Sequence, residues 1–270
     1  PRLALLPPAL LVLPVPPRIN RISLSNKPAQ TPRKERKNMA LQQLTEYLGA
    51  KSYPGRTLAI ASDPTGSSAT IIYFIMGRSA NSQNRIFVQE GESVATQAFD
   101  ESKVEDPRLI IYPVYKRYGN THIVTNGDQT ATIYQALHSG IAPAEALLQR
   151  ECEPDAPNFT PRISLTTDPQ GYGLNIIKAA TKTGEKSLHF DYRFPYLPGL
   201  GHCIHTYIDD GNPLPSFCGE PIAFPYTADL GEKVWKAINP NYRISLLECV
   251  LDLHTWEMQS IRIFNRHTGD

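Results

Sequence analysis

The sequence predicts a single α+β domain in which strands outnumber helices. Runs of β-branched and aromatic residues recur along most of the chain, and the run Ala69–Met76 (ATIIYFIM) is apolar throughout, as in a strand buried on both faces. Helical spacing of apolar residues is confined to short stretches that strand runs separate, and the chain has no internal repeat. This order favours sheets packed on each other, with the helices outside.

Apolar and β-branched runs bounded by turn residues define the predicted strands. In the first half of the chain these are Thr57–Ala61, Ala69–Met76, Ile86–Gln89, Val94–Phe99, Leu109–Tyr118 and Thr121–Thr125. Pro113 interrupts the fifth run, which indicates an edge strand or a bulge there, because proline cannot donate a hydrogen bond to a neighbouring strand. The second half contributes Ile163–Thr167, Gly173–Ala180, Ser187–Tyr192, Cys203–Tyr207 and a final hairpin of Tyr242–Asp252 and Glu257–Phe264.

Four short helices are predicted, over residues 40–48, 128–137, 144–150 and 229–238. Leucines spaced three and four apart give the first helix one apolar face. The second follows an Asn-Gly turn, with Thr125 or Asp128 as its N-cap. Pro143 precedes the third helix at the N1-like position that proline favours.

The first 38 residues differ in composition from the rest of the chain. Residues 1–38 carry eight Lys or Arg and one acid, net +7, whereas the remainder carries 19 basic and 25 acidic residues, net −6. Prolines break the apolar run over residues 1–17, so we expect neither a transmembrane helix nor a clear signal peptide there. We interpret residues 1–38 as a disordered, basic and proline-rich leader, from upstream translation or targeting, and residues 39–270 as the domain.

The charge balance and the cysteines indicate which partners the protein binds and in which compartment it lies. A mildly acidic body does not resemble a nucleic-acid-binding protein. The four cysteines are widely spaced, none in a C-x-x-C pair, and we interpret them as free thiols in a reducing compartment, the cytoplasm: Cys152, Cys203, Cys218 and Cys249. We expect no membrane partner, and homo-oligomerisation stays open.

Three polar segments predict one site built from several strand ends. Glu151–Ile163 (ECEPDAPNFTPRI) holds three prolines that make it extended and stiff, and it carries five charged or amide side chains. Gly77–Arg85 (GRSANSQNR) and Thr125–Thr130 (TNGDQT) are polar, glycine-containing and follow apolar strand-like runs. Such segments are most often solvated connectors, but three of them in one domain indicate a common site.

Five stretches, in this order along the chain, resemble the archaeal-type IMP cyclohydrolase family, including its bacterial members. They are Tyr53–Arg56 (YPGR), Ile72–Arg85 (IYFIMGRSANSQNR), Ile123–Thr130 (IVTNGDQT), Glu153–Ile163 (EPDAPNFTPRI) and His205–Pro221 (HTYIDDGNPLPSFCGEP). The resemblance covers about residues 53 to 265 and implies a four-layer αββα sandwich of the Ntn-hydrolase-like type without the Ntn nucleophile. It also implies closure of a formamido-imidazole-carboxamide ribotide to inosine monophosphate with loss of water, a step of purine biosynthesis that needs no metal or redox cofactor.

The resemblance places catalytic candidates in the matched stretches and beside them. We expect Arg85 to stabilise charge on the formyl oxygen, with Asn84 holding substrate oxygens beside it. Tyr112, on the strand before the TNG turn, is the candidate proton donor for that oxygen. Glu153 is the candidate base for the carboxamide N–H, and its alternative is a structural ion pair with an arginine.

Six further residues are candidates for substrate binding. Guanidinium groups match phosphate oxygens in fixed geometry, although any single arginine is more often a surface residue. The candidates for the 5′-phosphate are Arg56, Arg78 and Arg162, and those for the edge of the base are Asn126, Asp128 and Asn158. The block His205–Pro221 belongs to the bacterial branch, and from it His205, Asp210 and Glu220 either line the site or lie in a structural insertion.

Other chemistries fit the residues less well. His202 and His205 have H-x2-H spacing, but residues three apart on a strand point to opposite faces, so we expect one packed inward and one at the surface, without a metal. No G-x-S-x-G elbow is present. Two alternatives stay open: an Ntn-like amide hydrolase with a processed N-terminal Ser52, and a purine-nucleotide-binding protein without turnover.

Overall fold

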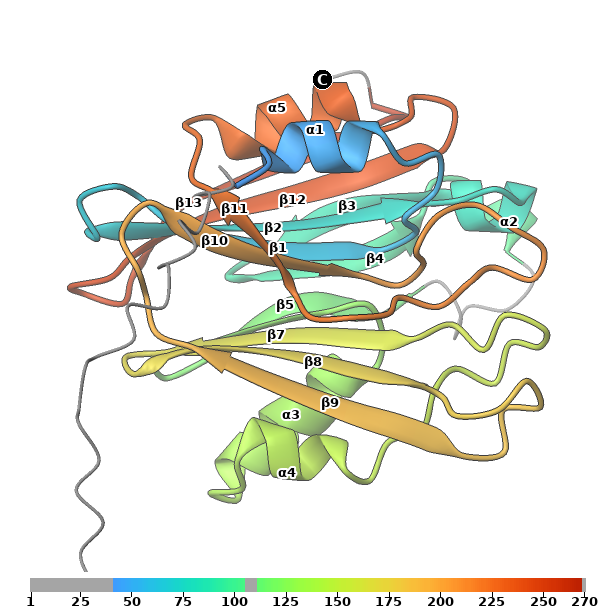
Figure 1. Ribbon diagram of the computed structural model, residues 1–270, viewed down its shortest axis with the longest axis horizontal. Coiled ribbons are helices and arrows are strands. Elements are labelled where there is room, and N and C mark those ends of the chain that lie inside the picture. The colour runs from blue at the N-terminus through green and yellow to red at the C-terminus, as the bar shows by residue number, and fades with distance from the viewer. Residues whose placement is uncertain (1–40, 105–110, 269–270) are drawn as a thin grey trace, which may run out of the picture. The chain divides into compact units, whose positions relative to one another are not determined.

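Two antiparallel β-sheets form the framework of the chain in the computed structural model (Figure 1), which describes residues 41–104 and 111–268. The first sheet has the order β11-β10-β1-β2-β12-β13, and the second has the order β3-β4-β5-β6-β7-β8-β9. The strands of the first sheet are β1 (Thr57–Ser62), β2 (Ser68–Met76), β10 (Leu200–His205), β11 (Ile222–Pro225), β12 (Arg243–Asp252) and β13 (Met258–Asn265). Those of the second are β3 (Arg85–Glu90), β4 (Ser93–Ala98), β5 (Pro113–Tyr118), β6 (Thr121–Thr125), β7 (Arg162–Asp168), β8 (Gly171–Ala179) and β9 (Ser187–Phe194).

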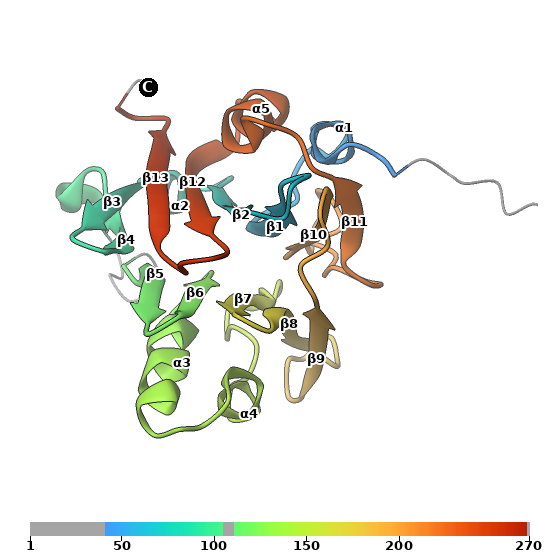
Figure 2. The same cartoon turned by 90° about the vertical axis from the view of Figure 1, so that its left-hand side faces the viewer.

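Helices cover the outer face of each sheet (Figures 1 and 2). Helices α1 (Leu44–Gly49) and α5 (Leu230–Ala237) lie on the six-stranded sheet, and α3 (Gln129–His138) and α4 (Pro143–Leu147) lie on the seven-stranded sheet. A four-residue helix, α2 (Ala80–Gln83), and a 3₁₀ turn, η1 (Glu101–Lys103), lie in the connections beside β3 and β4. The α+β class is therefore confirmed.

Strand β2 shows why a continuous apolar run is needed at the centre of this arrangement. Successive side chains of a strand point to opposite faces. Ile71, Tyr73 and Ile75 join the core between the two sheets, and Ile72 and Phe74 join the core beneath α1 and α5. Each such side chain, fully buried, stabilises the fold by about 1.5–3 kcal/mol. A third, smaller cluster lies under α3 and α4.

Several predicted boundaries need correction. The predicted strand Leu109–Tyr118 begins as a strand only at Pro113, and residues 105–110 lie outside the described part of the chain. The register between β4 and β5 shifts opposite this proline, so the predicted bulge is confirmed. Helix α4 ends at Leu147, three residues before the predicted end. Helix α2 and strand β11 were not predicted, because each is only four residues long.

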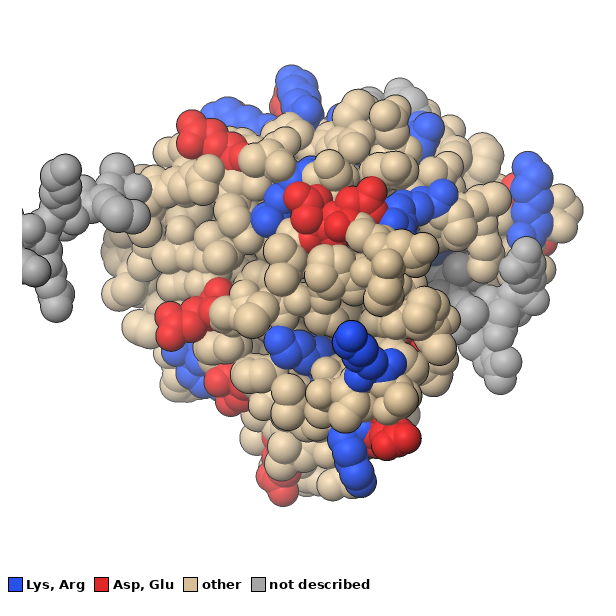
Figure 3. Space-filling model, turned by 45° about the vertical axis from the view of Figure 1, so that its right-hand side comes forward, with Lys and Arg blue, Asp and Glu red and all other residues tan. Residues whose placement is uncertain are grey.

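The predicted leader, residues 1–38, lies outside the described residues, and its role stays a prediction. Among the residues described, no helix is long and apolar enough to cross a membrane. On the face shown in Figure 3, acidic and basic side chains are interspersed. That face lacks the broad basic surface with which proteins track nucleic acid phosphates.

Asn265 joins the edge strands of the two sheets. Its Oδ1 accepts a hydrogen bond from Phe87 N at 2.9 Å, and its Nδ2 donates to Phe87 O at 3.0 Å. Phe87 lies in β3 and is 2% exposed. We expect Asn265→Ala to lower the free energy of unfolding by about 3 kcal/mol, because it leaves a buried N–H and a buried C=O without partners. Urea denaturation measures this.

The matched control for this substitution is Gln259→Ala. Gln259 is exposed, and its amide makes one side-chain hydrogen bond, to Asp252. It should change the free energy of unfolding by less than about 0.5 kcal/mol. Equal effects of the two substitutions would contradict the assigned role of Asn265.

Candidate active site

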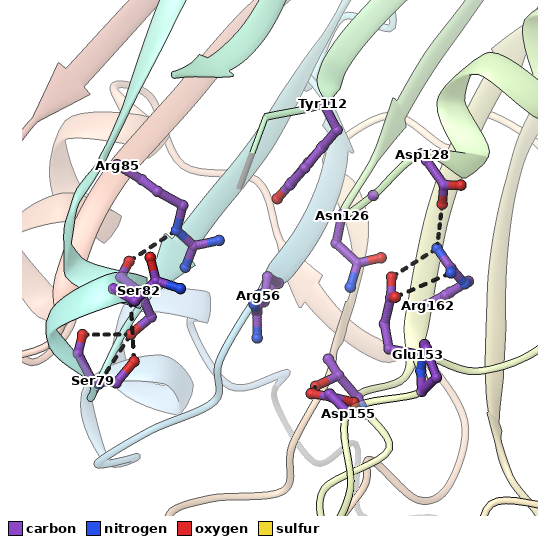
Figure 4. Close-up of a pocket in the computed structure, with 14 residues that line it drawn as sticks. Arg56, Ser79, Ser82, Arg85, Tyr112, Asn126, Asp128, Glu153, Asp155 and Arg162 are labelled. Atoms are coloured by element: carbon purple, nitrogen blue, oxygen red, sulfur yellow. Dashed lines mark hydrogen bonds and ion pairs between the residues drawn. The ribbon is translucent and has the colours of Figure 1, made fainter. Parts of the chain in front are cut away.

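A cavity of about 550 Å³ opens at one end of the two sheets (Figure 4). Its lining comes from five separate stretches of the chain and is mostly polar or charged. The lining residues are Arg56, Ser79, Asn81, Ser82, Arg85, Tyr112, Asn126, Gly127, Asp128, Glu153, Pro154, Asp155, Thr160 and Arg162. All three polar segments predicted from the sequence contribute to it.

The antiparallel register explains why these stretches meet. The start of β1 pairs with the end of β2, so Arg56 lies beside the connection that carries α2. In the other sheet the end of β6 pairs with the start of β7, which brings Asn126–Asp128 beside Glu153–Arg162. Loops at one end of both sheets therefore surround a single space, as is common for ligand sites held on a rigid scaffold.

One side of the cavity carries two arginines that have no carboxylate partner among the described residues. Arg85 is 1% exposed; its Nε donates to Ser82 O at 2.9 Å, and its Nη2 is buried with no hydrogen-bond partner in the part of the chain that is described. The half-buried Arg56 likewise has a buried, unpartnered Nε within those residues. Burial and the neighbouring Arg56 cation lower the pKa of Arg85. Unsatisfied buried donors and repelling cations destabilise the folded state, and an anionic or carbonyl ligand would relieve both.

The opposite side of the cavity holds a network of ion pairs. Arg162 Nη1 lies 2.6 Å from Asp128 Oδ1 and 2.7 Å from Glu153 Oε1, and Arg150 Nη2 lies 2.5 Å from Asp128 Oδ1. Partial burial opposes ionisation of Asp128, but the ion pairs with Arg150 and Arg162 prevail and lower its pKa. Burial raises the pKa of Glu153 despite the nearby Arg162, and the Asp128 charge raises it further. Glu153 is therefore easier to protonate than Asp128.

A turn after β6 supports this network from behind. Gly127 packs against it so closely that a Cβ there would lie 3.1 Å from both Arg162 Nη1 and Glu153 Oε1, and 2.7 Å from Gln129 Oε1. Any larger residue would displace one of these atoms. The glycine of the TNGDQT segment is thus needed for side-chain packing at the cavity wall.

Tyr112 reaches the cavity from between the two sides. In Figure 4 its hydroxyl points into the space between Arg85 and Asn126. Its backbone is fixed by Thr96, whose Oγ1 accepts from Tyr112 N at 2.9 Å and whose N–H donates to Tyr112 O at 3.0 Å. The side chain is only 6% exposed. A buried phenol at a defined place is suited to donate one proton to a bound oxygen.

Seven of the ten predicted site residues line the cavity, and three do not. Arg78 pairs with Asp210 at 2.5 Å and lies over the Tyr53 ring. The Asn84 side chain exchanges two hydrogen bonds of 2.8 Å with the backbone of Asp100. Asn158 Oδ1 accepts from Leu214 N at 3.0 Å. These three side chains hold loops in place.

Asn126 and Arg162 are engaged by the protein, as are the carboxylates of Asp128 and Glu153. The Asn126 amide binds the backbone of Pro161 and Ile163, at 2.9 and 2.8 Å, and so joins the β6 turn to β7. Arg162 has its guanidinium in the ion-pair network and also donates from Nε to Glu151 O at 2.8 Å. Neither side chain is as available to a ligand as Arg56 or Arg85.

Residues of the block His205–Pro221 support the cavity wall. Tyr207 OH bonds Thr160 Oγ1 at 2.6 Å, and Thr160 Oγ1 in turn donates to Asp155. Burial raises the pKa of Tyr207, which keeps this phenol protonated. Of the three candidates in the block, none lines the cavity: His205 is buried, Asp210 pairs with Arg78, and Glu220 is exposed.

The two histidines of β10 point to opposite faces, as predicted, but the expectation that one lies at the surface is wrong. His202 stacks on Phe194 and bonds Tyr172 OH at 2.6 Å. His205 bonds Tyr47 OH, from α1, at 2.7 Å. Both are buried because the second sheet covers one face of β10 and helices cover the other. Within residues 41–104 and 111–268 there is no group of His, Cys, Asp or Glu placed to hold a metal ion.

Several lining residues were not predicted from the sequence. Ser79, Asn81 and Ser82 belong to the GRSANSQNR segment, and a capping box between Ser79 and Ser82 shapes the turn that brings them to the cavity. Asp155 and Thr160 flank Asn158 in the proline-rich stretch. The sequence places these residues in two of the segments predicted to form the site. It does not show which side chains of those segments face the cavity.

Comparison with known proteins adds two findings. The profile of a family described as IMP cyclohydrolase-like protein matches residues 53–252. The IMP cyclohydrolase of Methanopyrus kandleri is 33% identical over 129 residues, which cover 46% of this chain. That match spans 63% of the relative, less than two thirds of its length.

Proposed function

The chain belongs to the IMP cyclohydrolase-like family, and on that premise we propose that it closes 5-formamido-imidazole-4-carboxamide ribotide to inosine monophosphate with loss of water. One observation carries the proposal most strongly. A buried guanidinium, Arg85, has an unpartnered nitrogen within the described residues and faces Glu153, whose pKa burial raises, across one cavity. The reaction needs two such groups, a stabiliser for an oxygen that gains charge and a base for the carboxamide proton.

The bonds that change determine what the site must do. The carboxamide nitrogen attacks the formyl carbon, and the formyl oxygen leaves as water with one hydrogen from the carboxamide and one from the formamide nitrogen. Both reacting groups belong to one molecule, so holding the reactive rotamer supplies much of the acceleration. The rest comes from proton transfer and charge stabilisation.

The three catalytic candidates lie on different sides of that reaction centre. Arg85 polarises the formyl oxygen and stabilises its negative charge. Tyr112 donates one proton to the same oxygen as it leaves, and it takes back the formamide N–H proton that is lost as the new C–N double bond forms. Glu153 accepts the carboxamide proton and returns it to the oxygen, which leaves as water, and the contact of Glu153 with Arg162 orients the carboxylate. If Glu153 instead forms only a structural ion pair with Arg162, Glu153→Gln should keep wild-type turnover.

Arg56 is the best placed of the three candidates for the phosphate. Arg162 is committed to Asp128 and Glu153, and Arg78 is committed to Asp210 outside the cavity. Arg56 faces the cavity and makes no ion pair or side-chain hydrogen bond within the described chain. A dianionic phosphate beside it also offsets its repulsion of Arg85.

The layered arrangement supports the fold that the resemblance implies. Helices on the outer faces of two stacked sheets are consistent with a four-layer αββα sandwich of the Ntn-hydrolase-like type. The Ntn-like amide hydrolase alternative is less well supported. Ser52 does not line the cavity, and its N–H is engaged by Asp209 Oδ1 at 2.7 Å.

Product identification tests the proposed reaction. The full chain incubated with the formylated ribotide should yield inosine monophosphate, lighter than the substrate by one water, as measured by liquid chromatography and mass spectrometry. Conversion no faster than in buffer would contradict the proposal. Stabilisation by inosine monophosphate without conversion would instead support a binding protein, and a mature chain beginning at Ser52 would support the amide hydrolase.

Binding of the product should depend on its phosphate. Inosine monophosphate at about 100 times its Kd should stabilise the chain by about 2.7 kcal/mol, whereas inosine at the same concentration should stabilise it far less. Thermal denaturation with each ligand measures this. Arg56→Met should abolish the difference between nucleotide and nucleoside, and Arg78→Met, the control outside the cavity, should keep it. Equal shifts from both ligands with the unmodified chain would contradict the role of Arg56.

A further inference from the structure

A second tyrosine hydroxyl, from a residue outside the cavity lining, contacts the hydroxyl of Tyr112. Tyr73, in β2, has its hydroxyl 3.2 Å from the Tyr112 hydroxyl. Tyr73 is completely buried, and its ring stacks on Phe87 at 5.6 Å. The pair links the central strand of one sheet to the segment entering β5 of the other. Tyr73 does not line the cavity and therefore cannot touch a ligand there.

The surroundings of Tyr73 determine the direction of this hydrogen bond. Within residues 41–104 and 111–268, the Tyr112 hydroxyl is the one hydrogen-bond partner of the Tyr73 hydroxyl. If Tyr112 donated, the Tyr73 hydrogen would be buried without an acceptor, which is unfavourable. Burial, and then the neighbouring Tyr112, raise the pKa of Tyr73, so it stays a neutral phenol able to donate. Tyr73 therefore donates to Tyr112.

This direction leaves the Tyr112 hydrogen free to point into the cavity. Figure 4 shows the Tyr112 oxygen facing the space between Arg85 and Asn126, with Arg56 beyond it. A hydrogen bond received from Tyr73 also stabilises the phenolate that remains once Tyr112 has given its proton away. Both effects favour proton donation by Tyr112 to a bound oxygen.

We propose that Tyr73 is a positioning residue that acts through Tyr112, orienting its hydroxyl hydrogen toward the substrate and stabilising the phenolate that proton donation produces. The proposal rests on the proposed function in that the accepting oxygen is the substrate's formyl oxygen. It goes beyond that function because it assigns a role to a buried residue outside the cavity.

Kinetics of single and double variants test this role. Tyr73→Phe should lower kcat about tenfold with KM within about twofold, because it removes a supporting hydrogen bond and leaves the binding groups in place. The fall of kcat at alkaline pH should begin at higher pH. Adding Tyr73→Phe to Tyr112→Phe should not lower kcat further, since a residue that acts only through the Tyr112 hydroxyl has no effect once that hydroxyl is removed. Equal losses in both backgrounds, or wild-type kcat for Tyr73→Phe, would overturn the proposal.

A matched control separates this role from general loss of stability. Tyr115→Phe removes another buried tyrosine hydroxyl, which bonds His122 Nδ1 at 2.9 Å away from the cavity lining. This variant should keep the wild-type kcat, and its kcat should fall at the same alkaline pH as that of the wild type. A tenfold loss in this variant as well would show that the Tyr73 effect is structural.

A second readout does not depend on turnover. Ultraviolet difference titration of the chain should contain one phenolate step that Tyr112→Phe lacks, and Tyr73→Phe should move that step to higher pH. An unmoved step would overturn the proposal even with an active enzyme. Absence of turnover with a moved step would refute the proposed function while retaining the hydrogen bond from Tyr73.

Discussion

Replacing Arg85 by methionine should lower kcat about 1,000-fold without lowering the melting temperature of the empty protein. A preorganised donor aimed at a developing oxyanion contributes about 2.7–4 kcal/mol to catalysis, which corresponds to a loss of this size. Steady-state kinetics and thermal denaturation of the same preparation measure the two quantities.

The expected stability follows from the surroundings of Arg85. The guanidinium is 1% exposed, has no carboxylate partner in the described residues, and is repelled by Arg56. A buried, uncompensated charge destabilises the folded state, so a neutral side chain of similar length should keep or raise the melting temperature. The expected gain in stability and loss of activity have one cause, since the charge that destabilises the fold is the one proposed to hold the substrate oxygen.

Arg117→Met is the matched control for this substitution. Arg117 forms a two-point ion pair with Glu257, at 2.6 and 2.9 Å, outside the cavity. Its removal should leave kcat within about twofold and lower stability slightly, if at all. A kcat for Arg85→Met within tenfold of wild type would contradict the role of Arg85.

The second substitution with a large effect is Glu153→Gln, which should lower kcat about 100-fold or more, since general bases contribute about 10²–10⁴-fold. The pH dependence should also change. A base must be ionised to act, so kcat/KM of the wild type should fall as pH falls through the pKa of Glu153. Burial raises that pKa above 4.5, its ordinary value, so the fall should begin above the pH expected for an exposed glutamate.

Two neighbouring charges should shift the fall of kcat/KM at low pH, the acid limb of the profile, in opposite directions. Asp128 raises the pKa of Glu153, so Asp128→Asn should move the limb to lower pH. Arg162 lowers that pKa, so Arg162→Met should move the limb to higher pH. The pH profile of kcat/KM for each variant checks both signs. Wild-type turnover in Glu153→Gln would mean that Glu153 is only a structural partner of Arg162.

The sequence predicts those strands and loops well whose position depends on a pattern within one segment. The unbroken apolar run of β2 indicates burial on both faces, and its side chains alternate between two cores. Pro113 marks a bulge, and the polar segments after β2 and β6 lie at the cavity. Short elements such as β11 depend on pairing with β10, which no local pattern contains.

The contacts that individual polar side chains make could not be predicted in the same way. Asn84 and Asn158 have the residue type of a binding group, but backbone groups 16 and 56 residues away engage them. Arg162 has the type of a phosphate ligand, yet Asp128 neutralises it from another loop. Only the folded arrangement shows that Arg56 and Arg85 lack a carboxylate partner among the described residues, and that each keeps one buried nitrogen without a hydrogen bond there.

The most direct test of this account is the rate of ring closure, followed by absorbance, for the full chain and for Arg85→Met side by side with the formylated ribotide. We expect the unmodified chain to accelerate closure by at least about 10⁶-fold over the uncatalysed reaction, as enzymes typically do, and Arg85→Met to lose about 1,000-fold of that acceleration. Equal rates for the two proteins, or no acceleration by either, would contradict the claim that this cavity catalyses the reaction.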